Sequence, residues 1–250
     1  MKKVTIVMVY YQRQNVLNKT LESLKQYDPK SFNVIIVDNV SPDDIILPKV
    51  DYPIRVIKQK DPKYKQVILA YNEGFKQAIN DGAEIIVFQC SECAHSGDVL
   101  SIARKVKKGT YFAFPCYSLK EGDDIDNVII NNRAAKFDGD EGWYNHELYS
   151  PRYFNFCAAM TADDLIKING FDERFKDGIA YEDDYLVYQL RQAGIKLVIP
   201  TYGPFVFHQW HYNTVFNADR GAKISYNKEL FVKLIKEGKY KALHLITPDL

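Results

Sequence analysis

The chain has 250 residues, and 33 Lys and Arg against 32 Asp and Glu give it a formal net charge of +1. This balance provides no overall electrostatic attraction to nucleic acid. No stretch reaches the roughly 20 apolar residues that a membrane-spanning helix needs, and the apolar run near the N-terminus is too short for a signal peptide. We therefore expect a globular cytoplasmic protein whose four cysteines are reduced thiols.

The first half of the sequence alternates apolar, β-branched runs with segments of helical periodicity. The predicted strands are 4–11, 33–38, 54–59 and 84–89, and the predicted helices are 15–27, 68–83 and 97–109. This alternation predicts an α/β fold, a mostly parallel sheet flanked by helices in a single domain. Ligands of such sheets bind beyond the carboxyl ends of the strands, so the residues that follow each strand are the candidates for a site.

The second half is less regular. Residues 110–119 are strand-like, and the polar, aromatic stretch 120–152 indicates a long loop or an inserted subregion. The remaining predictions are a helix at 161–170, begun by a Thr161 and Asp164 capping pair, a helix at 181–194, strands at 195–200 and 204–211, and a basic amphipathic helix at 227–243. We expect this last helix to pack on the domain, with contact to a membrane surface as the alternative.

A Cys-x-x-Cys pair, Cys90 and Cys93, follows the strand predicted at 84–89. This spacing serves redox or zinc chemistry in some proteins. A zinc site needs a second pair, and Cys116 and Cys157 stand alone in apolar surroundings. We therefore expect buried, inert thiols.

Asp38 directly follows the strand "NVIIVD", and Asn39 and Ser41 come next in a turn. A carboxylate at the end of a parallel strand is placed to accept hydrogen bonds from a nucleotide base or ribose. The same residue types are also common turn formers.

Three adjacent carboxylates, Glu182, Asp183 and Asp184, open the helix predicted at 181–194. Their mutual repulsion favours raised pKa values, which suit a general base. An acidic first turn that complements the helix dipole is the alternative. Two of the five histidines, His208 and His211, cluster at the end of the last predicted strand, where imidazoles suit a divalent ion or a phosphate.

In this order the motifs resemble the glycosyltransferases of the GT-A fold, specifically family 2 with a galactosyltransferase-like C-terminal segment. The stretches that carry the resemblance are "VTIVMVYYQRQNVLNKTLESL", "VIIVDNVSPDD", "AYNEGFKQAINDGAEIIVFQ" and "INGFDERFKDGIAYEDDYLVYQLRQAG". The resemblance implies a GT-A domain at 1–220, with a nucleotide-binding half at 1–118 and an acceptor-binding and catalytic half at 119–220. Residues 221–250 are then a C-terminal helical extension.

The resemblance also implies a function, an inverting, hexosyltransferase-type transfer from a nucleotide-sugar donor, with UDP-sugars favoured, to a glycan or other hydroxyl acceptor in surface polysaccharide synthesis. Asp183 is then the catalytic base and Glu182 its neighbour. The implied donor-binding residues are Tyr10, Tyr11, Arg13, Asp38, Asn39, Ser41, Asn72, Gln89 and Ser91. The implied acceptor-binding residues are Trp143, Tyr144 and Asp184.

One motif departs from the family pattern. Family members usually have an Asp-x-Asp motif for a divalent ion and the donor diphosphate where this chain has Gln89 and Ser91, followed by Glu92. Neutral oxygens hold a hard cation less firmly than carboxylates do. The resemblance implies Mn²⁺ or Mg²⁺ bound by Glu92 and His208, with the donor phosphates as further ligands.

Two other classes of function remain open at this level. One is a non-catalytic or metal-independent nucleotide-sugar-binding protein in which the "QCSE" tip has lost the metal. The other is a nucleotidyltransferase, for which a glycine-rich phosphate loop is expected near the N-terminus; "VYYQRQN" contains no glycine.

Overall fold

The computed structural model describes residues 3–59, 66–136, 139–212 and 219–243. Its centre is a seven-stranded sheet. In spatial order its strands are β10 (Lys196–Val198), β6 (Thr110–Ala113), β9 (Cys157–Thr161), β4 (Ile85–Cys90), β1 (Val4–Tyr10), β2 (Phe32–Asp38) and β3 (Ile54–Lys58). β9 runs antiparallel to both of its neighbours, and the other pairs are parallel. The mostly parallel α/β sheet predicted from the sequence is confirmed.

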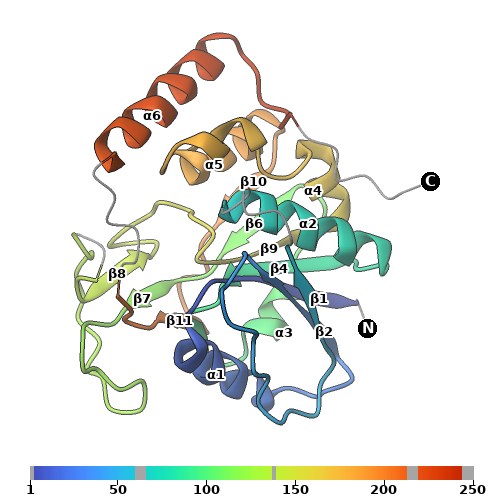
Figure 1. Cartoon of the computed structure of the whole chain (residues 1–250), viewed down its shortest axis with the longest axis vertical. Coiled ribbons are helices and arrows are strands. Elements are labelled where there is room, and N and C mark those ends of the chain that lie inside the picture. The colour runs from blue at the N-terminus through green and yellow to red at the C-terminus, as the bar shows by residue number, and fades with distance from the viewer. Residues whose placement is uncertain (1–2, 60–65, 137–138, 213–218, 244–250) are drawn as a thin grey trace.

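Helices cover both faces of this sheet (Figure 1). One face carries α2 (Val67–Asn80), α4 (Ala162–Ile168) and α5 (Glu182–Gln192), with α6 (Arg220–Lys236) outside them, and the other face carries α1 (Gln14–Ser23) and α3 (Val99–Ala103). Successive side chains of a strand point to opposite faces. Val7 and Val9 therefore join the α2 layer, while Ile6 and Met8 pack under α1.

α2 lies unusually close to the sheet, and a glycine makes this possible. A Cβ atom built on Gly74 would come 2.4 Å from Cγ1 of Val7 and 3.1 Å from Cγ2 of Val37. Only a residue without a side chain fits between the helix and the two central strands. The glycine in the "YNEGF" segment is thus explained by packing.

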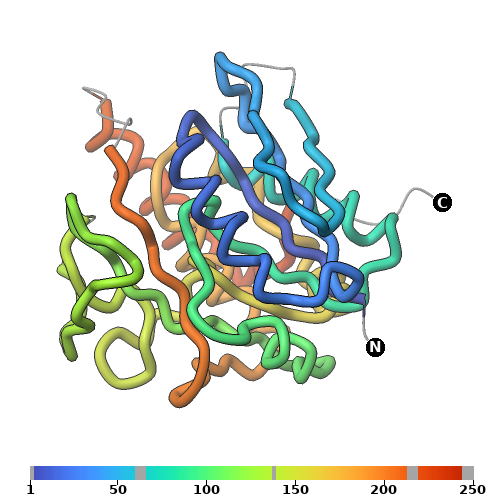
Figure 2. The backbone as a smooth tube through the Cα atoms, turned by 90° about the horizontal axis from the view of Figure 1, so that it is seen from below, coloured from blue at the N-terminus to red at the C-terminus, as the bar shows by residue number. Residues whose placement is uncertain are grey.

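A second, four-stranded sheet lies beside the first in the order β5 (Cys93–Ser96), β11 (Phe205–His208), β7 (Cys116–Ser118) and β8 (Gly142–Asn145). The predicted single strand at 110–119 is wrong, because it divides at Pro115 into β6 and β7, which belong to different sheets. Proline lacks the N–H that a continuous ladder requires. Figure 2 shows β11 passing between the main sheet and the segment 120–152.

Several element boundaries differ from those expected. α3 ends at Ala103, well before residue 109, because Val106 turns into the core under the main sheet. α6 begins at Arg220, before residue 227, and ends at Lys236. The capping pair of α4 is confirmed, since Thr161 Oγ1 accepts a 3.2 Å hydrogen bond from the Asp164 N–H. The described chain also contains two short 3-10 helices, η1 (Leu24–Gln26) and η3 (Glu173–Asp177).

α6 packs on the main domain, as predicted for the last helix. Its Leu234 is buried in the same core layer as α2 and α5. None of the helices in the described ranges combines the length and apolarity that a membrane crossing requires. Residues 244–250 of the predicted extension lie outside the described residues.

Candidate functional site

The carboxyl ends of β1, β2 and β4 lie side by side. Tyr10 pairs with Asp38, and Val9 pairs with Cys90. The three segments that follow these strands therefore meet at one edge of the sheet, where they line a cavity of about 640 Å³. Its other walls come from α2, from the segment before α5 and from α6. The polar, charged and aromatic residues that line it include Tyr11, Arg13, Asn39, Tyr71, Ser91, Glu92, Glu182, Arg220 and Lys223.

A charged cluster centred on Glu92 lies at this cavity. The register of β11 against β5 places His208 opposite Cys93, directly after Glu92. Glu92 Oε1 is paired with the Arg13 guanidinium and lies 3.2 Å from His211 Nε2 and 3.8 Å from His208 Nε2. The Ser91 hydroxyl donates to Glu92 Oε2 at 2.8 Å. A side-chain anion and three nitrogen groups from distant parts of the chain thus converge on one point.

The electrostatics of Glu92 favour its ionised form. Burial by itself raises the pKa of this carboxyl, but the hydrogen bond from His211 and the charges of Arg13 and His208 outweigh it, so the pKa lies well below its usual value. Glu92 is therefore a carboxylate at neutral pH. A buried carboxylate beside two imidazoles is a chemically competent cation ligand.

Gln209 holds the Glu92 turn in place, a role that no sequence motif indicates. Its backbone N–H and its side-chain amide each donate to the Glu92 carbonyl at 3.1 Å. The same amide also reaches the Thr20 hydroxyl of α1 at 3.0 Å. Gln209 thereby connects α1, the β4–β5 turn and the end of β11.

The acidic first turn of α5 follows a strained backbone. Ala180 and Tyr181 have φ angles of 63° and 68°, in the left-handed region that non-glycine residues rarely adopt. Such outliers persist only where the surroundings hold them, and they cluster at functional sites. Burial, with the charges of Glu182 and Asp184, raises the pKa of the Asp183 carboxyl well above its usual value.

Tyr71 connects the Glu92 cluster with the acidic turn. Burial raises the pKa of the Tyr71 phenol, and the charges of Glu92 and Asp183 both raise it further. Both carboxylates therefore lie within electrostatic reach of one buried ring in the wall of the cavity. Glu182, next to the predicted base Asp183, lines the same cavity as Glu92, the predicted metal ligand.

A second cavity, of about 600 Å³, lies on the other side of the α5 first turn. Glu182 lines the first cavity and Asp184 lines the second. The ring of Tyr181, 5.6 Å from that of Phe231 in α6, stands beside this turn. The second cavity is lined by Arg152, Phe154, Asp184, Val187, Tyr188, Arg191, Phe231 and Ile235.

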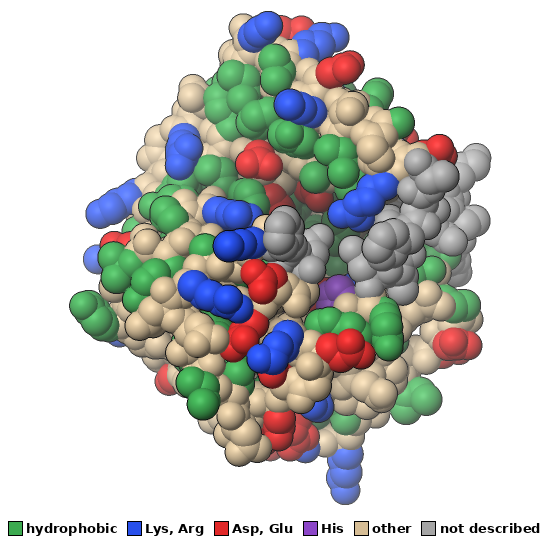
Figure 3. All heavy atoms as spheres, turned by 90° about the vertical axis from the view of Figure 1, so that its left-hand side faces the viewer, with side chains coloured by type: hydrophobic (Ala, Val, Ile, Leu, Met, Phe, Trp, Pro, Cys, Tyr) green, Lys and Arg blue, Asp and Glu red, His purple; other side chains and the backbone are tan. Residues whose placement is uncertain are grey.

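Figure 3 shows the face of the molecule on which α6 and β8 lie. The surface is hollowed there, and a histidine side chain is visible in the hollow. Both basic and acidic side chains lie around its rim.

The predicted donor-binding residues divide into two groups. Tyr11, Arg13, Asn39 and Ser91 line the first cavity. Among the described residues Asn39 Oδ1 and Arg13 Nε are buried at the edge of this cavity without a hydrogen-bond partner.

The second group does not line the cavity and lies in the turns and core behind it. Asp38 is buried and accepts a 2.9 Å hydrogen bond from the Ser41 N–H, while the Ser41 hydroxyl accepts from the Gln12 N–H at 3.2 Å. These two residues shape the turn after β2. Tyr10 is buried under α1.

Gln89 and Asn72 do not line the cavity, and the structure gives them internal roles. Gln89 is fully buried, donates to the Cys93 carbonyl at 2.8 Å and bonds His95 Nε2 at 2.6 Å. Asn72 exchanges hydrogen bonds with both backbone groups of Phe171. Gln89 is part of β4 and Asn72 lies on the buried side of α2, and their polar atoms are satisfied within the core, which corrects the expectation that they contact a donor.

The predicted acceptor-binding aromatics also differ in position. Trp143 is buried in the second sheet, edge-to-face with Tyr117 at 5.1 Å, and therefore offers no free stacking face. Tyr144 packs edge-to-face on His208 at 5.2 Å and belongs to the surroundings of the histidines. Of the three predicted acceptor residues, Asp184 alone lines a described cavity.

The Glu92 cluster fits a divalent metal ion. Ligand atoms of Glu92, His208 and His211 lie within 4.8 Å of one another. This set includes His211, which the resemblance did not imply as a ligand. Two imidazoles and one carboxylate suit Mn²⁺ better than Mg²⁺, which prefers oxygen ligands throughout. The Arg13 guanidinium, which is paired with the same carboxylate, competes with a cation for it.

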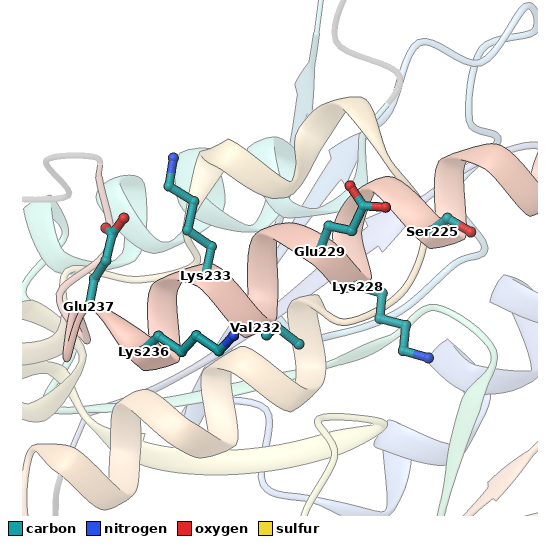
Figure 4. Close-up of a pocket in the computed structure, with 7 residues that line it drawn as sticks. All are labelled: Ser225, Lys228, Glu229, Val232, Lys233, Lys236 and Glu237. Atoms are coloured by element: carbon teal, nitrogen blue, oxygen red, sulfur yellow. The ribbon is translucent and has the colours of Figure 1, made fainter.

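Another hollow runs along the outer side of α6 (Figure 4). Its lining comes from this helix and its C-terminal cap alone, namely Ser225, Lys228, Glu229, Val232, Lys233, Lys236 and Glu237. It contains neither the carboxylate–histidine cluster nor the acidic turn. We therefore place the chemistry at the end of the main sheet.

The cysteines are free thiols, as predicted. Cys93, Cys116 and Cys157 are fully buried, and burial raises the pKa of Cys93 and of Cys157 well above the usual value. Cys90 and Cys93 sit in two different strands around the β4–β5 turn. A protonated, buried thiol is a poor nucleophile and a poor metal ligand.

Comparison with known proteins identifies the family. The sequence model described as "Glycosyl transferase family 2" matches residues 5–156, more than half of the chain. No curated protein matches the sequence.

Solved structures resemble this fold at low sequence identity. TarS of S. aureus (residues 1–349) in complex with UDP-GlcNAc superposes with a TM-score of 0.62 at 12% identity, covering 94% of this chain and 66% of that one. The same protein in complex with UDP gives 0.58 at 13% identity, with 84% and 61% covered. Mannosyltransferase PcManGT from Pyrobaculum calidifontis, in complex with GDP-Man and Mn²⁺, gives 0.57 at 15% identity, with 95% and 65% covered. This chain therefore spans about two thirds or less of the length of each.

Proposed function

The chain belongs to glycosyl transferase family 2, and we propose that it transfers a sugar, with inversion, from a nucleotide-sugar donor to a hydroxyl group of a glycan acceptor. The observation that carries this proposal is the convergence of two groups of residues on one cavity. The Glu92 cluster comes from the ends of β4 and β11, and the acidic turn comes from the start of α5. The GT-A fold and the acidic turn beside a cavity lined by Arg13, Arg220 and Lys223 suit this reaction.

The donor nucleotide belongs in the first cavity by this proposal. Arg13 and Asn39 have buried polar atoms without partners in the described structure, which suits the many acceptors and donors of a nucleotide diphosphate. Arg220 and Lys223 add positive charge to the opposite wall. A UDP-sugar is the favoured donor, because structural neighbours are bound to UDP and UDP-GlcNAc.

Asp183 is the proposed catalytic base. An inverting transfer needs one group that takes the proton from the acceptor hydroxyl as its oxygen attacks the anomeric carbon and the nucleoside diphosphate leaves. The raised pKa of Asp183 brings its basicity closer to neutral pH, where a general base works best. Glu182, on the donor side of the same turn, is placed to orient the reacting groups.

Glu92, His208 and His211 would hold a divalent ion, and Mn²⁺ is our preferred cofactor. Such an ion supplies positive charge to the donor diphosphate and stabilises it as a leaving group. Arg13 is paired with Glu92 and supplies positive charge at the same place. We also propose that the enzyme acts in the cytoplasm, in surface polysaccharide synthesis. The proposed organisation of the chain is a nucleotide-binding half at 1–118, an acceptor-binding and catalytic half at 119–220 and a C-terminal helical extension at 221–250.

Replacing the base tests this proposal. Asp183→Asn keeps the size of the side chain and removes its ability to accept a proton, so we expect transfer to fall by about 100-fold or more. The affinity for the donor nucleotide should change little, because Asp183 does not line the donor cavity. Sugar transfer from a panel of UDP-, GDP- and dTDP-sugars, with nucleotide binding measured by calorimetry, gives both quantities.

Asp177→Asn is the matched control, since Asp177 is exposed at the end of η3. It should retain full activity. Full turnover in Asp183→Asn would contradict the base assignment. Nucleotide binding without any transfer by the wild type would favour the non-catalytic binding protein instead.

A further inference from the structure

The second cavity contains features that the proposed reaction has not yet used. It is bounded by α5, α6 and the segment 152–154, and two arginines, Arg152 and Arg191, line it. Among the described residues neither guanidinium makes an ion pair or a side-chain hydrogen bond. Asp184 is the single acidic residue in the lining, so the cavity has an excess of positive charge.

The cavity also has aromatic walls. Phe154, Tyr188 and Phe231 line it and are each partly exposed. Aromatic faces pack against the apolar faces of sugar rings. The guanidinium group of arginine binds a carboxylate or phosphate through two parallel hydrogen bonds. Its volume of about 600 Å³ accommodates a ligand of one or two sugar units.

The position of the cavity relative to the base decides which substrate belongs there. Glu182 faces the donor cavity, Asp184 faces the second cavity, and Asp183 lies between them in the same helical turn. A sugar bound in the second cavity lies beside the first turn of α5, next to the base. A hydroxyl group of such a sugar that extends past Asp183 toward Glu182 and the donor cavity would meet both the base and the anomeric carbon.

We propose that the second cavity binds the acceptor and that the acceptor is anionic, a sugar bearing a carboxylate or phosphate group held by Arg152 and Arg191. This inference rests on the proposed function and extends it from a glycan acceptor in general to a charged class. Arg152 acts at the entrance beside Asp184, whose pKa is raised by burial and partly lowered again by the Arg152 charge. Arg191, on the next turns of α5, extends the positive surface.

Small probes test this inference on the full chain. Glucose 6-phosphate, glucuronate and glucose are titrated into the protein by calorimetry, both with saturating UDP, which fills the donor cavity, and without nucleotide. We expect at least one anionic sugar to bind tenfold or more tightly than glucose, with an affinity that falls as salt is added. Comparison of the phosphate with the carboxylate identifies the anion.

The double variant Arg152→Gln/Arg191→Gln should lose that preference by tenfold or more and leave UDP binding unchanged. Lys228→Gln/Lys236→Gln, which removes the same charge from the outer groove of α6 (Figure 4), is the matched control and should retain it.

Equal affinity for glucose and both anionic sugars, or an unchanged preference in the arginine variant, would overturn the inference. Neither result affects the proposed function, which fails separately if the wild type neither binds a nucleotide nor cleaves a nucleotide sugar. The two failures are therefore distinguishable in one set of titrations.

Discussion

Glu92 is the residue around which the chemistry of this protein is arranged. It has three nitrogen-bearing partners, Arg13, His208 and His211, and all of them approach the same carboxylate oxygen. An arginine and a metal ion cannot both be bound closely to that oxygen without repelling each other. Ion binding therefore requires the Arg13 guanidinium to move away from Glu92, most simply toward the donor phosphates.

This competition gives a prediction for the metal. We expect Mn²⁺ to bind the wild type weakly without nucleotide and about tenfold or more tightly with UDP, because the diphosphate supplies oxygen ligands and attracts Arg13. Glu92→Gln should abolish the binding, since it removes the only charged ligand of the set. Electron paramagnetic resonance of free Mn²⁺ measures binding directly, without reference to activity.

Arg13→Gln provides the comparison. Without the competing guanidinium, Mn²⁺ should bind more tightly in the absence of UDP, and UDP should enhance it less. Mn²⁺ affinity that is unaffected by either substitution would remove the ion from this cluster, and activity that also persists in a chelator would establish a metal-independent enzyme.

At the residue scale, position after a strand predicted several residues that line the cavity. Arg13, Ser91 and Glu92 lie within three residues of the ends of β1 and β4 and line it, whereas Asp38 ends β2 and shapes the turn behind it. Gln89 and Asn72 carry the same signal as a ligand-binding amide, and only their contacts with Cys93, His95 and Phe171 show that they are used internally. Polar residue type alone does not distinguish a ligand contact from a satisfied core hydrogen bond.

At the scale of elements, the close approach of α2 to the sheet is the feature that fixes the donor edge. Gly74→Ala should destabilise the protein by about 1–3 kcal/mol, because the added methyl group would overlap Val7 in a packed core. Chemical denaturation monitored by circular dichroism measures the change in the free energy of unfolding.

Two further variants make the interpretation specific. Gly221→Ala, in the first turn of α6 where nothing lies within 4 Å of the added Cβ, should be neutral or slightly stabilising. Val7→Ala in the Gly74→Ala background should cost less than it does alone, since it relieves the overlap. Equal effects of Gly74→Ala and Gly221→Ala would show that packing against Val7 is not the reason for this glycine.

Elements were predictable from the sequence where periodicity is strong. β1, β2, β4 and α2 match their predicted ranges to within about three residues. β5 and β8 were not predicted, and neither was the pairing of β7 and β11 in a second sheet, because short strands of three or four residues are set by pairing with distant segments and not by local pattern. The same non-local pairing brings His208 beside Glu92, which local sequence does not specify.

At the scale of the whole molecule, α6 joins the C-terminal part of the chain to the catalytic turn. The Asn227 amide of α6 donates to the carbonyls of Phe175 at 3.1 Å and Ala180 at 2.8 Å, on both sides of Gly178. A Cβ atom on Gly178 would lie 2.1 Å from Asn227 Oδ1, so the contact requires glycine. These bonds hold the loop whose last residues, Ala180 and Tyr181, have the strained backbone.

This contact leads to a prediction about coupling between α6 and the active site. Asn227→Ala should lower the free energy of unfolding by about 1–3 kcal/mol, because the buried Phe175 carbonyl and the part-buried Ala180 carbonyl lose their donor. It should also reduce transfer, because a loosened loop no longer holds Asp183 between the two cavities. Hydrogen exchange should rise at 175–182 while β1 and β4 remain protected.

Lys228→Ala, at the neighbouring exposed position of α6, makes the same change to alanine without touching the loop and should leave exchange at 175–182 unchanged. If Asn227→Ala raised exchange only within α6 and left both the loop and the transfer rate unaltered, α6 would be a passive cover. If the loop and the rate change together, the strained turn before Asp183 is maintained by the helix packed over it, and the C-terminal part of the chain is a working component of the active site.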